Sequence, residues 1–146
     1  MKSNEIHDLI ITQEKIVLTE GGQIRGIITV ADPCYAGFGE AYLSSIDGGV
    51  TRGWKRHRRM TLNLMVLQGG IRFFIFDERE DSESFGVVQD IELTSIENKR
   101  LTIPPMLWFA FSGTGSSTNV LLNIADIMHS EAEIDRAPLN YAKLTV

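Results

Sequence analysis

The residues best suited to chemistry gather in one short stretch, GVTRGWKRHRR at positions 49–59. It holds five Lys or Arg side chains and one His, in a chain whose formal net charge is −5. Arginine binds phosphate oxygens, and proteins tune Lys and His to move protons near neutral pH. The stretch therefore predicts a pocket that holds an anionic substrate. The alternative is an exposed edge strand on which Arg side chains block aggregation.

Alternation along a strand would divide this cluster between two faces. Successive strand side chains point in opposite directions, which groups Lys55, His57 and Arg59 on one face. Asn63 continues the same parity if no bulge interrupts positions 59–61. If that face points inward, its cations need an anion or a carboxylate nearby, because an unpaired buried charge is costly.

Lys55 is a candidate general base. Partial burial beside Arg52, Arg56 and Arg59 would lower its pKa, because desolvation and nearby positive charge both disfavour the ammonium form. A neutral Lys could remove a proton next to a ketone, and a neighbouring donor would stabilise the enolate oxygen. Alternatively, Lys55 is a plain cation that pairs with ligand phosphates or with Glu40.

Two histidines offer further sites for proton transfer. His57 would form a dyad with a carboxylate such as Glu40 or Asp47, or it is a hydrogen-bonded core histidine. His129 lies in a polar tail close to two glutamates, which suggests a local salt-bridge network or a lid over the pocket.

The elements that must position these residues are short strands. About ten segments are rich in β-branched or aromatic residues, and Gly-bearing turns such as TEGG, DGG, QGG and SGTGSS separate them. Only the segment IMHSEAEIDRA has helical spacing. This pattern predicts an all-β jelly-roll barrel. The sequence shows neither a linker nor a repeat, so we expect one domain over residues 1–146.

The composition argues against several classes of partner. The chain has 14 Lys and Arg against 19 Asp and Glu, so general binding to nucleic acid is not expected. The polar first segment and the lack of an apolar run of roughly 20 residues argue against secretion and membrane insertion. The single Cys excludes an internal disulfide and thiolate-rich zinc sites. We therefore expect a cytoplasmic protein with no membrane partner.

Several motifs in order carry a family resemblance. They are FGEAYLSSIDGGVTRGWK from Phe38, then FDERE after a Gly turn, then ENKRLTIPPMLWFAF, with LLNIADIMHSEAE as the closing strand and tail. Their order and spacing resemble the dTDP-4-dehydrorhamnose 3,5-epimerase family and the related dTDP-4-keto-6-deoxyhexose ketoisomerases. These enzymes are cupin-type jelly rolls that act on nucleotide sugars. The resemblance therefore implies a cupin fold for this chain.

The resemblance assigns some roles and leaves others vacant. Arg52 matches the Arg that holds the nucleotide diphosphate, and His57 matches a His of the ketoisomerases. Lys55 stands where the family has its catalytic His base. Leu122 falls at the position of the family's Tyr acid, and Leu62 falls near that of its enolate-stabilising Lys. The resemblance thus keeps part of the binding machinery, while the usual acid and base are replaced.

A metal site is not expected. Metal-binding cupins carry a motif in which a Gly is followed, after five residues of any type, by His-x-His. A Glu follows later in the chain, and a further His follows an Ile-Pro turn. Here Lys55 stands at the first ligand position and Phe109 at the last, so His57 alone remains. One imidazole does not hold a metal tightly. We expect neither a metal nor an organic cofactor.

Further substrate contacts are expected around the cluster. Glu40, Tyr42 and Asn63 would line the pocket walls, and Trp108 would stack on a base or a sugar ring. The segment GGQIRGIITV corresponds to an early strand that crosses to the neighbouring subunit in this family, so Arg25 would reach the partner's phosphates. The resemblance thus implies a homodimer joined through exchanged or paired strands.

Together these inferences indicate an epimerase- or isomerase-like cupin that acts on a dTDP-4-keto-6-deoxyhexose, in the synthesis of surface polysaccharide sugars. Lys55 and His57 would carry out a metal-free enolisation of this nucleotide-sugar substrate. The competing hypothesis is a non-catalytic module that binds a sugar nucleotide, or a carbohydrate, and assists a pathway enzyme. Turnover separates an enzyme from a module that only binds the nucleotide sugar.

Overall fold

Strands make up nearly all of the regular structure in the computed structural model, which describes residues 4–143. They are β1 (Ile10–Gln13), β2 (Ile16–Thr19), β3 (Gly22–Arg25), β4 (Glu40–Asp47), β5 (Thr51–His57), β6 (Leu62–Gln68), β7 (Gly70–Phe76), β8 (Val88–Thr94), β9 (Lys99–Ile103), β10 (Trp108–Gly113), β11 (Thr118–Ala125) and β12 (Ile134–Arg136). Two short 3₁₀ helices, η1 (Glu131–Glu133) and η2 (Leu139–Tyr141), lie near the C-terminus. No helix within the described range is long and apolar enough to cross a membrane. The predicted all-β fold class is confirmed.

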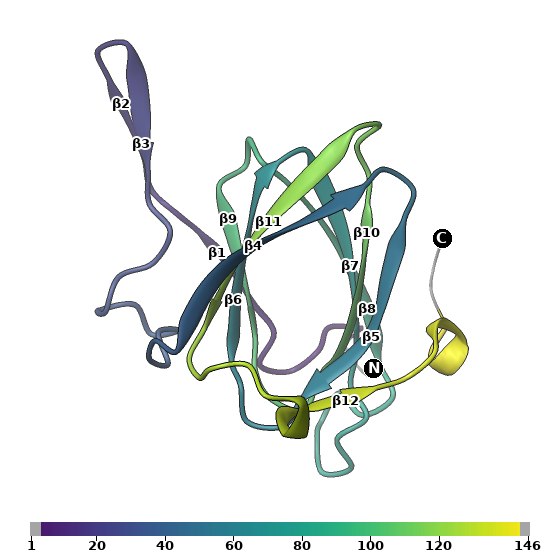
Figure 1. Ribbon diagram of the computed structural model, residues 1–146. Helices are drawn as coiled ribbons and strands as arrows, with labels where there is room; N and C mark the ends of the chain where they lie inside the picture. The colour runs from purple at the N-terminus through teal and green to yellow at the C-terminus, as the bar shows by residue number, and fades with distance from the viewer. Residues whose placement is uncertain (1–3, 144–146) are drawn as a thin grey trace.

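Two five-stranded antiparallel sheets face each other and form the body of the molecule (Figure 1). One sheet has the order β1-β9-β6-β11-β4, and the other has the order β12-β5-β10-β7-β8. Most neighbouring strands are not consecutive in the sequence, as in a jelly roll. Leu64 and Leu101 from the first sheet pack with Phe73 and Ile75 from the second, and together they form part of the buried core.

A bulge in β5 changes which side chains of the basic stretch share a face. Lys55 pairs with Phe109 of β10, and Arg52 pairs with Phe111. Between these two pairs β5 therefore has one residue more than β10, which is a β-bulge. Gly53 permits this, because a Cβ there would overlap the Ala110 methyl group and lie 2.9 Å from the Ala110 Cα. Strict alternation would send the side chains of Arg52 and Lys55 to opposite faces, and the bulge brings both to the inner face.

The expectation that Asn63 shares the face of Lys55 and His57 is wrong. Residues 58–61 form a loop after β5, and β6 starts with Leu62 and Leu64 in the core. Asn63 therefore points to the other side of its sheet. There it is buried, and its Oδ1 accepts hydrogen bonds from Arg100 Nε at 3.0 Å and Thr102 Oγ1 at 2.6 Å.

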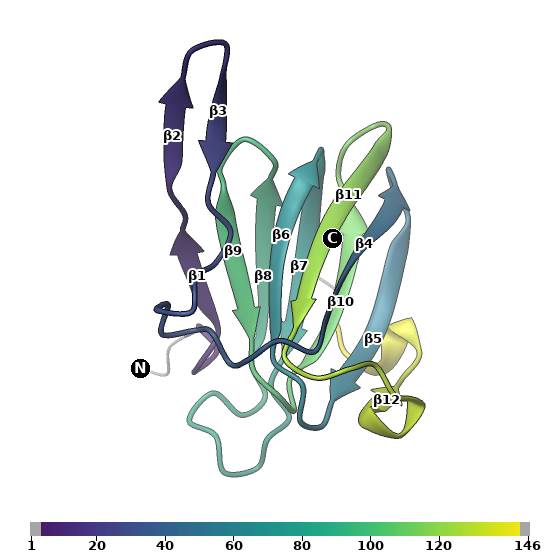
Figure 2. The same ribbon diagram turned by 60° about the vertical axis from the view of Figure 1, so that its left-hand side comes forward.

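The β2–β3 hairpin extends beyond the two sheets, as Figure 2 shows. Its apolar side chains are solvent-exposed, with Leu18 at 82% and Ile24 at 62% of full exposure. Arg25 lies at the end of β3, where its Nε donates to Asn98 Oδ1 at 2.9 Å and its guanidinium also bonds the Ser95 carbonyl. Arg25 thus contacts its own chain's β8–β9 turn, away from the pocket described below.

Candidate functional site

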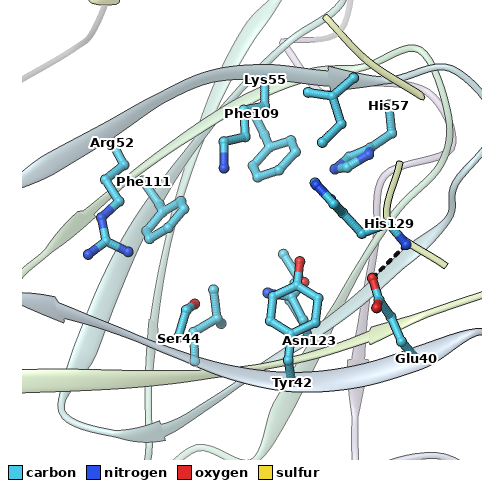
Figure 3. Close-up of a pocket in the computed structure, with 13 residues that line it drawn as sticks. Glu40, Tyr42, Ser44, Arg52, Lys55, His57, Phe109, Phe111, Asn123 and His129 are labelled. Carbon is cyan, nitrogen blue, oxygen red and sulfur yellow. Dashed lines mark hydrogen bonds between the residues drawn. The ribbon is translucent and has the colours of Figure 1, made fainter. Parts of the chain in front are cut away.

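A cavity of ≈ 400 Å³ lies between the two sheets, with residues of β4 on one wall and residues of β5 on the other (Figure 3). Strand β4 contributes Glu40, Tyr42 and Ser44, which alternate along the strand and so point the same way. Strand β5 contributes cationic side chains to the opposite wall. Figure 3 shows Tyr42 and Ser44 facing the β5 residues across the cavity.

The floor of the cavity is apolar. Phe109 and Phe111 of β10 and Leu121 of β11 line it, and these three side chains also belong to the core. The His57 ring stacks on Phe109, with centroids 5.8 Å apart and an interplanar angle of 17°. An apolar floor below a polar rim suits the ring face of a sugar or a base.

The structure brings Arg52, Lys55 and His57 to this cavity, as expected for a pocket rather than for a solvated edge strand. Within residues 4–143, neither Arg52 nor Lys55 forms an ion pair with a carboxylate, whereas most other arginines do. Arg56 pairs with Asp135 at 2.9 Å, and Arg59 pairs with Glu133 at 3.2 Å. The pocket therefore presents two cations, an exposed Arg52 and a half-buried Lys55, whose charge an anionic ligand can neutralise, while the carboxylate of Glu40 lies on the opposite wall.

The pKa of the Lys55 ammonium is lowered, as predicted. The largest cause is desolvation, followed by the positive charges of Arg136 and Arg52, while Glu131 opposes the shift. The predicted neighbours are thus correct only in part. Arg136, which comes from β12 beside β5, takes the place that the sequence suggested for Arg56 and Arg59. This shift makes the half-buried Lys55 ammonium easier to deprotonate, which is the direction that a proton acceptor needs.

His57 is 6% exposed, and burial is the largest cause of its lowered pKa. The charge of Glu133 opposes this effect. In the described part of the chain, its Nδ1 atom is buried and has no hydrogen-bond partner. Neither predicted dyad partner bonds to His57 within the described residues: Glu40 lines the same cavity but accepts from the His129 backbone N–H at 2.8 Å, and Asp47 accepts from Thr118 at 3.3 Å.

The C-terminal segment closes one end of the pocket. His129 and Ile134 line the cavity, and the His129 Nε2 lies 3.3 Å from Glu131 Oε1. Both sequence interpretations of His129 therefore find support, since it belongs to a local ion-pair network and also covers the pocket. Glu133, 4% exposed, anchors this segment by accepting the Met60 backbone N–H at 2.9 Å.

Trp108 does not lie in the pocket, which corrects the expectation that it stacks on a ligand there. It packs with the buried Trp54 on the other face of the β5–β10 sheet. Its Nε1 donates to Glu78 Oε2 at 2.9 Å, and the Arg56 guanidinium lies 4.6 Å from its ring centroid. Its parity along β10 is opposite to that of Phe109, so one strand sends these two rings to opposite faces.

Sequence reasoning missed Asn123, a β11 residue on the pocket wall. It lies in the otherwise largely apolar segment NVLLNIA, two positions after the core residue Leu121. A polar side chain at an inward parity position was the available signal. The described residues contain no group of three or more His, Cys, Asp or Glu side chains placed to hold a metal.

Similar solved structures share this architecture. A dTDP sugar isomerase from Desulfovibrio desulfuricans G20 is 30% identical, with a TM-score of 0.87 over 93% of this chain and 87% of that chain. A dTDP-4-dehydrorhamnose 3,5-epimerase from Elizabethkingia anophelis NUHP1 is 20% identical, with a TM-score of 0.82 over 92% and 78% of the two chains. The sugar 3,4-ketoisomerase QdtA from Thermoanaerobacterium thermosaccharolyticum is also 20% identical, with a TM-score of 0.75 over 91% and 90%. The predicted cupin-type jelly roll is thereby confirmed.

Sequence comparison identifies one curated relative, a probable low-salt glycan biosynthesis epimerase of Haloferax volcanii. It is 26% identical over 102 residues, which span 69% of this chain and 65%, or just under two thirds, of that protein. No family model matches the chain. The level of identity and coverage shared with the Desulfovibrio enzyme nevertheless places the chain in a family: it belongs to the dTDP-4-dehydrorhamnose 3,5-epimerases and related dTDP-sugar isomerases.

Proposed function

We propose that this protein is a cytoplasmic isomerase or epimerase of a dTDP-linked 4-keto-6-deoxyhexose, in glycan biosynthesis. The observation that carries the proposal is the unpaired cationic wall of Arg52 and Lys55 above an apolar floor, in a ≈ 400 Å³ cavity. The names of the Desulfovibrio isomerase and the Haloferax epimerase support the nucleotide-sugar class and the pathway. A diphosphate with a hexose matches both the charge and the apolar floor.

In this proposal Arg52 binds the diphosphate, and the hexose then lies beside Lys55 and His57. The neutral Lys55 amine removes the proton from the carbon beside the ketone. The C–H electron pair then forms the C=C bond of an enolate, and the C=O pair moves to oxygen, where an N–H of His57 stabilises it. Delivery of a solvent-derived proton to the other face of the same carbon, with release of the first proton from Lys55 to solvent, gives an epimer. Return of a proton to a neighbouring carbon, after proton exchange between the oxygens, gives a ketoisomer.

Incubation with dTDP-4-keto-6-deoxyglucose in deuterated water tests this mechanism. We expect deuterium to replace a carbon-bound proton next to the ketone, followed by NMR, faster than in buffer. The Lys55→Met variant should lose this exchange and keep dTDP binding. Buffer-level exchange in the folded wild type would overturn the enzymatic proposal. Full activity in Lys55→Met would overturn only the role of the base.

A second function, a non-catalytic sugar-nucleotide-binding module, has one specific observation in its favour. Leu122, at the position of the family's Tyr acid, pairs with Leu43 of β4 and does not line the cavity. The same incubation separates the two functions. A module would bind dTDP in calorimetry without any exchange of substrate protons.

We also infer a homodimer that uses the β2–β3 hairpin. Its apolar side chains are exposed in the described structure, and the hairpin extends beyond the two sheets. A strand pair of this kind is marginally stable alone and gains from packing on a second copy of the chain. Arg25 at the hairpin base would then lie close to the partner's pocket.

A further inference from the structure

Two buried asparagines on β11 differ in how their side chains are satisfied. Asn119, 1% exposed, donates from Nδ2 to the Ile46 and Ser117 carbonyls at 3.1 Å each and accepts the Gly70 N–H at 2.9 Å. Asn123 is 6% exposed, yet its buried Oδ1 has no hydrogen-bond partner in the described structure. The same residue type thus occurs once as a fully bonded structural group and once as an unfilled acceptor.

An unfilled buried acceptor destabilises the ligand-free protein, because the oxygen has lost water and gained nothing in return. Folded proteins retain few such groups, and a functional role or a bound partner is among the reasons for those that remain. Asn123 lines the cavity, and Figure 3 shows it beside Tyr42, on the wall opposite Lys55. Its pocket-side neighbours Leu121 and Leu64 are apolar, and the hydroxyl of Tyr42, its cross-strand partner on β4, forms no hydrogen bond with this oxygen in the described structure.

The two walls therefore present opposite chemistry. On β5, Lys55 and His57 carry N–H donors, which suit a ketone oxygen because that oxygen has no hydrogen to donate. On β11, the amide oxygen of Asn123 only accepts, so its partner must be an O–H or N–H group. Arg52 marks the phosphate end of the cavity, and Asn123 lies farther in, toward His57 and His129 (Figure 3).

We propose that Asn123 recognises a hydroxyl group on the hexose ring of the substrate, and that it thereby selects ketosugars that retain this hydroxyl. This inference rests on the proposed function and specifies its sugar. A nucleotide sugar held by Arg52 places its ketone against the β5 donors and one of its two remaining ring hydroxyls, at C2 or C3, against Asn123. A dideoxy sugar without that hydroxyl leaves the amide oxygen unfilled and is rejected, as sites with buried polar groups reject analogues that cannot pair with them.

The test compares Asn123→Leu with Asn119→Leu, two replacements of a buried amide by an apolar side chain of similar size on one strand. Calorimetry measures binding of dTDP and of dTDP-6-deoxyglucose, which has the ring hydroxyls and no ketone to react. We expect Asn123→Leu to bind dTDP like the wild type and dTDP-6-deoxyglucose about tenfold more weakly, the loss of one hydrogen bond. Analogues that lack the C2 or the C3 hydroxyl identify the partner. Removal of the recognised hydroxyl should weaken binding to the wild type and leave binding to Asn123→Leu unchanged.

Thermal melting provides a readout that a structural role would not produce. Ligand-free Asn123→Leu should melt at or above the wild-type temperature, because the unfilled acceptor is gone. Asn119→Leu should melt lower, because it loses three hydrogen bonds. A lower melting temperature or a failure to fold in Asn123→Leu would overturn the inference, as would equal sugar affinity in variant and wild type. Absence of dTDP binding in the wild type would instead overturn the proposed function itself.

Discussion

At the scale of single residues, the charge state of the pocket depends on which cations have partners. Arg56, Arg58 and Arg72 each pair with a carboxylate on the outside of the sheet, whereas Arg52 and Lys55 face the cavity and form no ion pair within residues 4–143. Desolvation keeps the pKa values of Lys55 and His57 below their ordinary values. Desolvation therefore shifts both the Lys55 amine and the His57 imidazole toward their neutral forms, which favours proton transfer.

Replacing Arg52 should weaken nucleotide binding. Arg52→Gln removes a charge-assisted contact to phosphate, which corresponds to a loss of about 10- to 100-fold in affinity. Calorimetry with dTDP measures this loss, and Arg72→Gln, whose partner Asp90 lies outside the pocket, is the matched control. Equal affinities of Arg52→Gln and wild type for dTDP would contradict the assignment of Arg52 to the phosphates.

The pH dependence of proton exchange should respond to Arg136. Lys55 accepts a proton only when neutral, so the rate rises as pH increases through its lowered pKa. Arg136→Gln removes a positive charge that lowers this pKa and frees Glu131, which raises it. The rising limb of kcat/KM against pH should therefore move to higher pH. Arg58→Gln, which loses its pair with Asp135, is the control and should leave the rising limb of the pH profile unchanged. If the rising limb does not move in Arg136→Gln, Lys55 is excluded as the base.

At the scale of elements, the bulge in β5 decides the composition of the cationic wall. The side chain of Trp54 is fully buried on the outer face, and the residues on either side of the bulge, Arg52 and Lys55, both face the pocket. Glu133 holds the C-terminal segment against the loop after β5, so that His129 reaches the same cavity. One irregular strand and one anchored tail therefore assemble the polar half of the site.

Substitution at the bulge should cost stability and activity together. In Gly53→Ala the new methyl group overlaps Ala110, and overpacking of this kind costs about 1–3 kcal/mol of unfolding free energy. Chemical denaturation measures this cost. Gly22→Ala, with only Thr19 Oγ1 at 3.9 Å from the new methyl, is the control and should change stability little. A Gly53→Ala protein as stable as wild type would show that β5 does not need this close approach.

At the scale of the whole molecule, the β2–β3 hairpin projects beyond the two packed sheets, and its apolar side chains are exposed to solvent. Charged replacements on its apolar side chains, Leu18→Asp with Ile24→Asp, should convert a dimer into monomers, because a buried apolar contact would become a pair of like charges. Sedimentation analysis measures the change. Ile96→Asp, at an equally exposed position on another turn, is the control. A wild-type protein that sediments as a monomer would contradict the homodimer.

The family resemblance predicted more of the site residues than the alternation of side chains along a strand could predict alone. The resemblance put Arg52 and Lys55 together, and the structure supplies the reason in the bulge at Gly53. Asn63 was misplaced because a loop reset the parity between β5 and β6, which no local pattern reveals. Trp108 lies outside the pocket because its parity along β10 is opposite to that of Phe109, although its indole ring would suit stacking. Asn123 was overlooked because an isolated Asn in a strand does not show whether its amide has partners.

The sequence by itself determined the strands, the turns and the identity of the charged cluster, because alternation and glycine placement are local properties of the chain. The tertiary structure decided which cations remain without a carboxylate, which His faces a cavity and which buried amide lacks a partner. These depend on neighbours far apart in the chain, such as Arg136 near Lys55 and Glu133 near His57. Pairing and desolvation across two sheets, rather than residue type, turn a basic strand into a candidate active site.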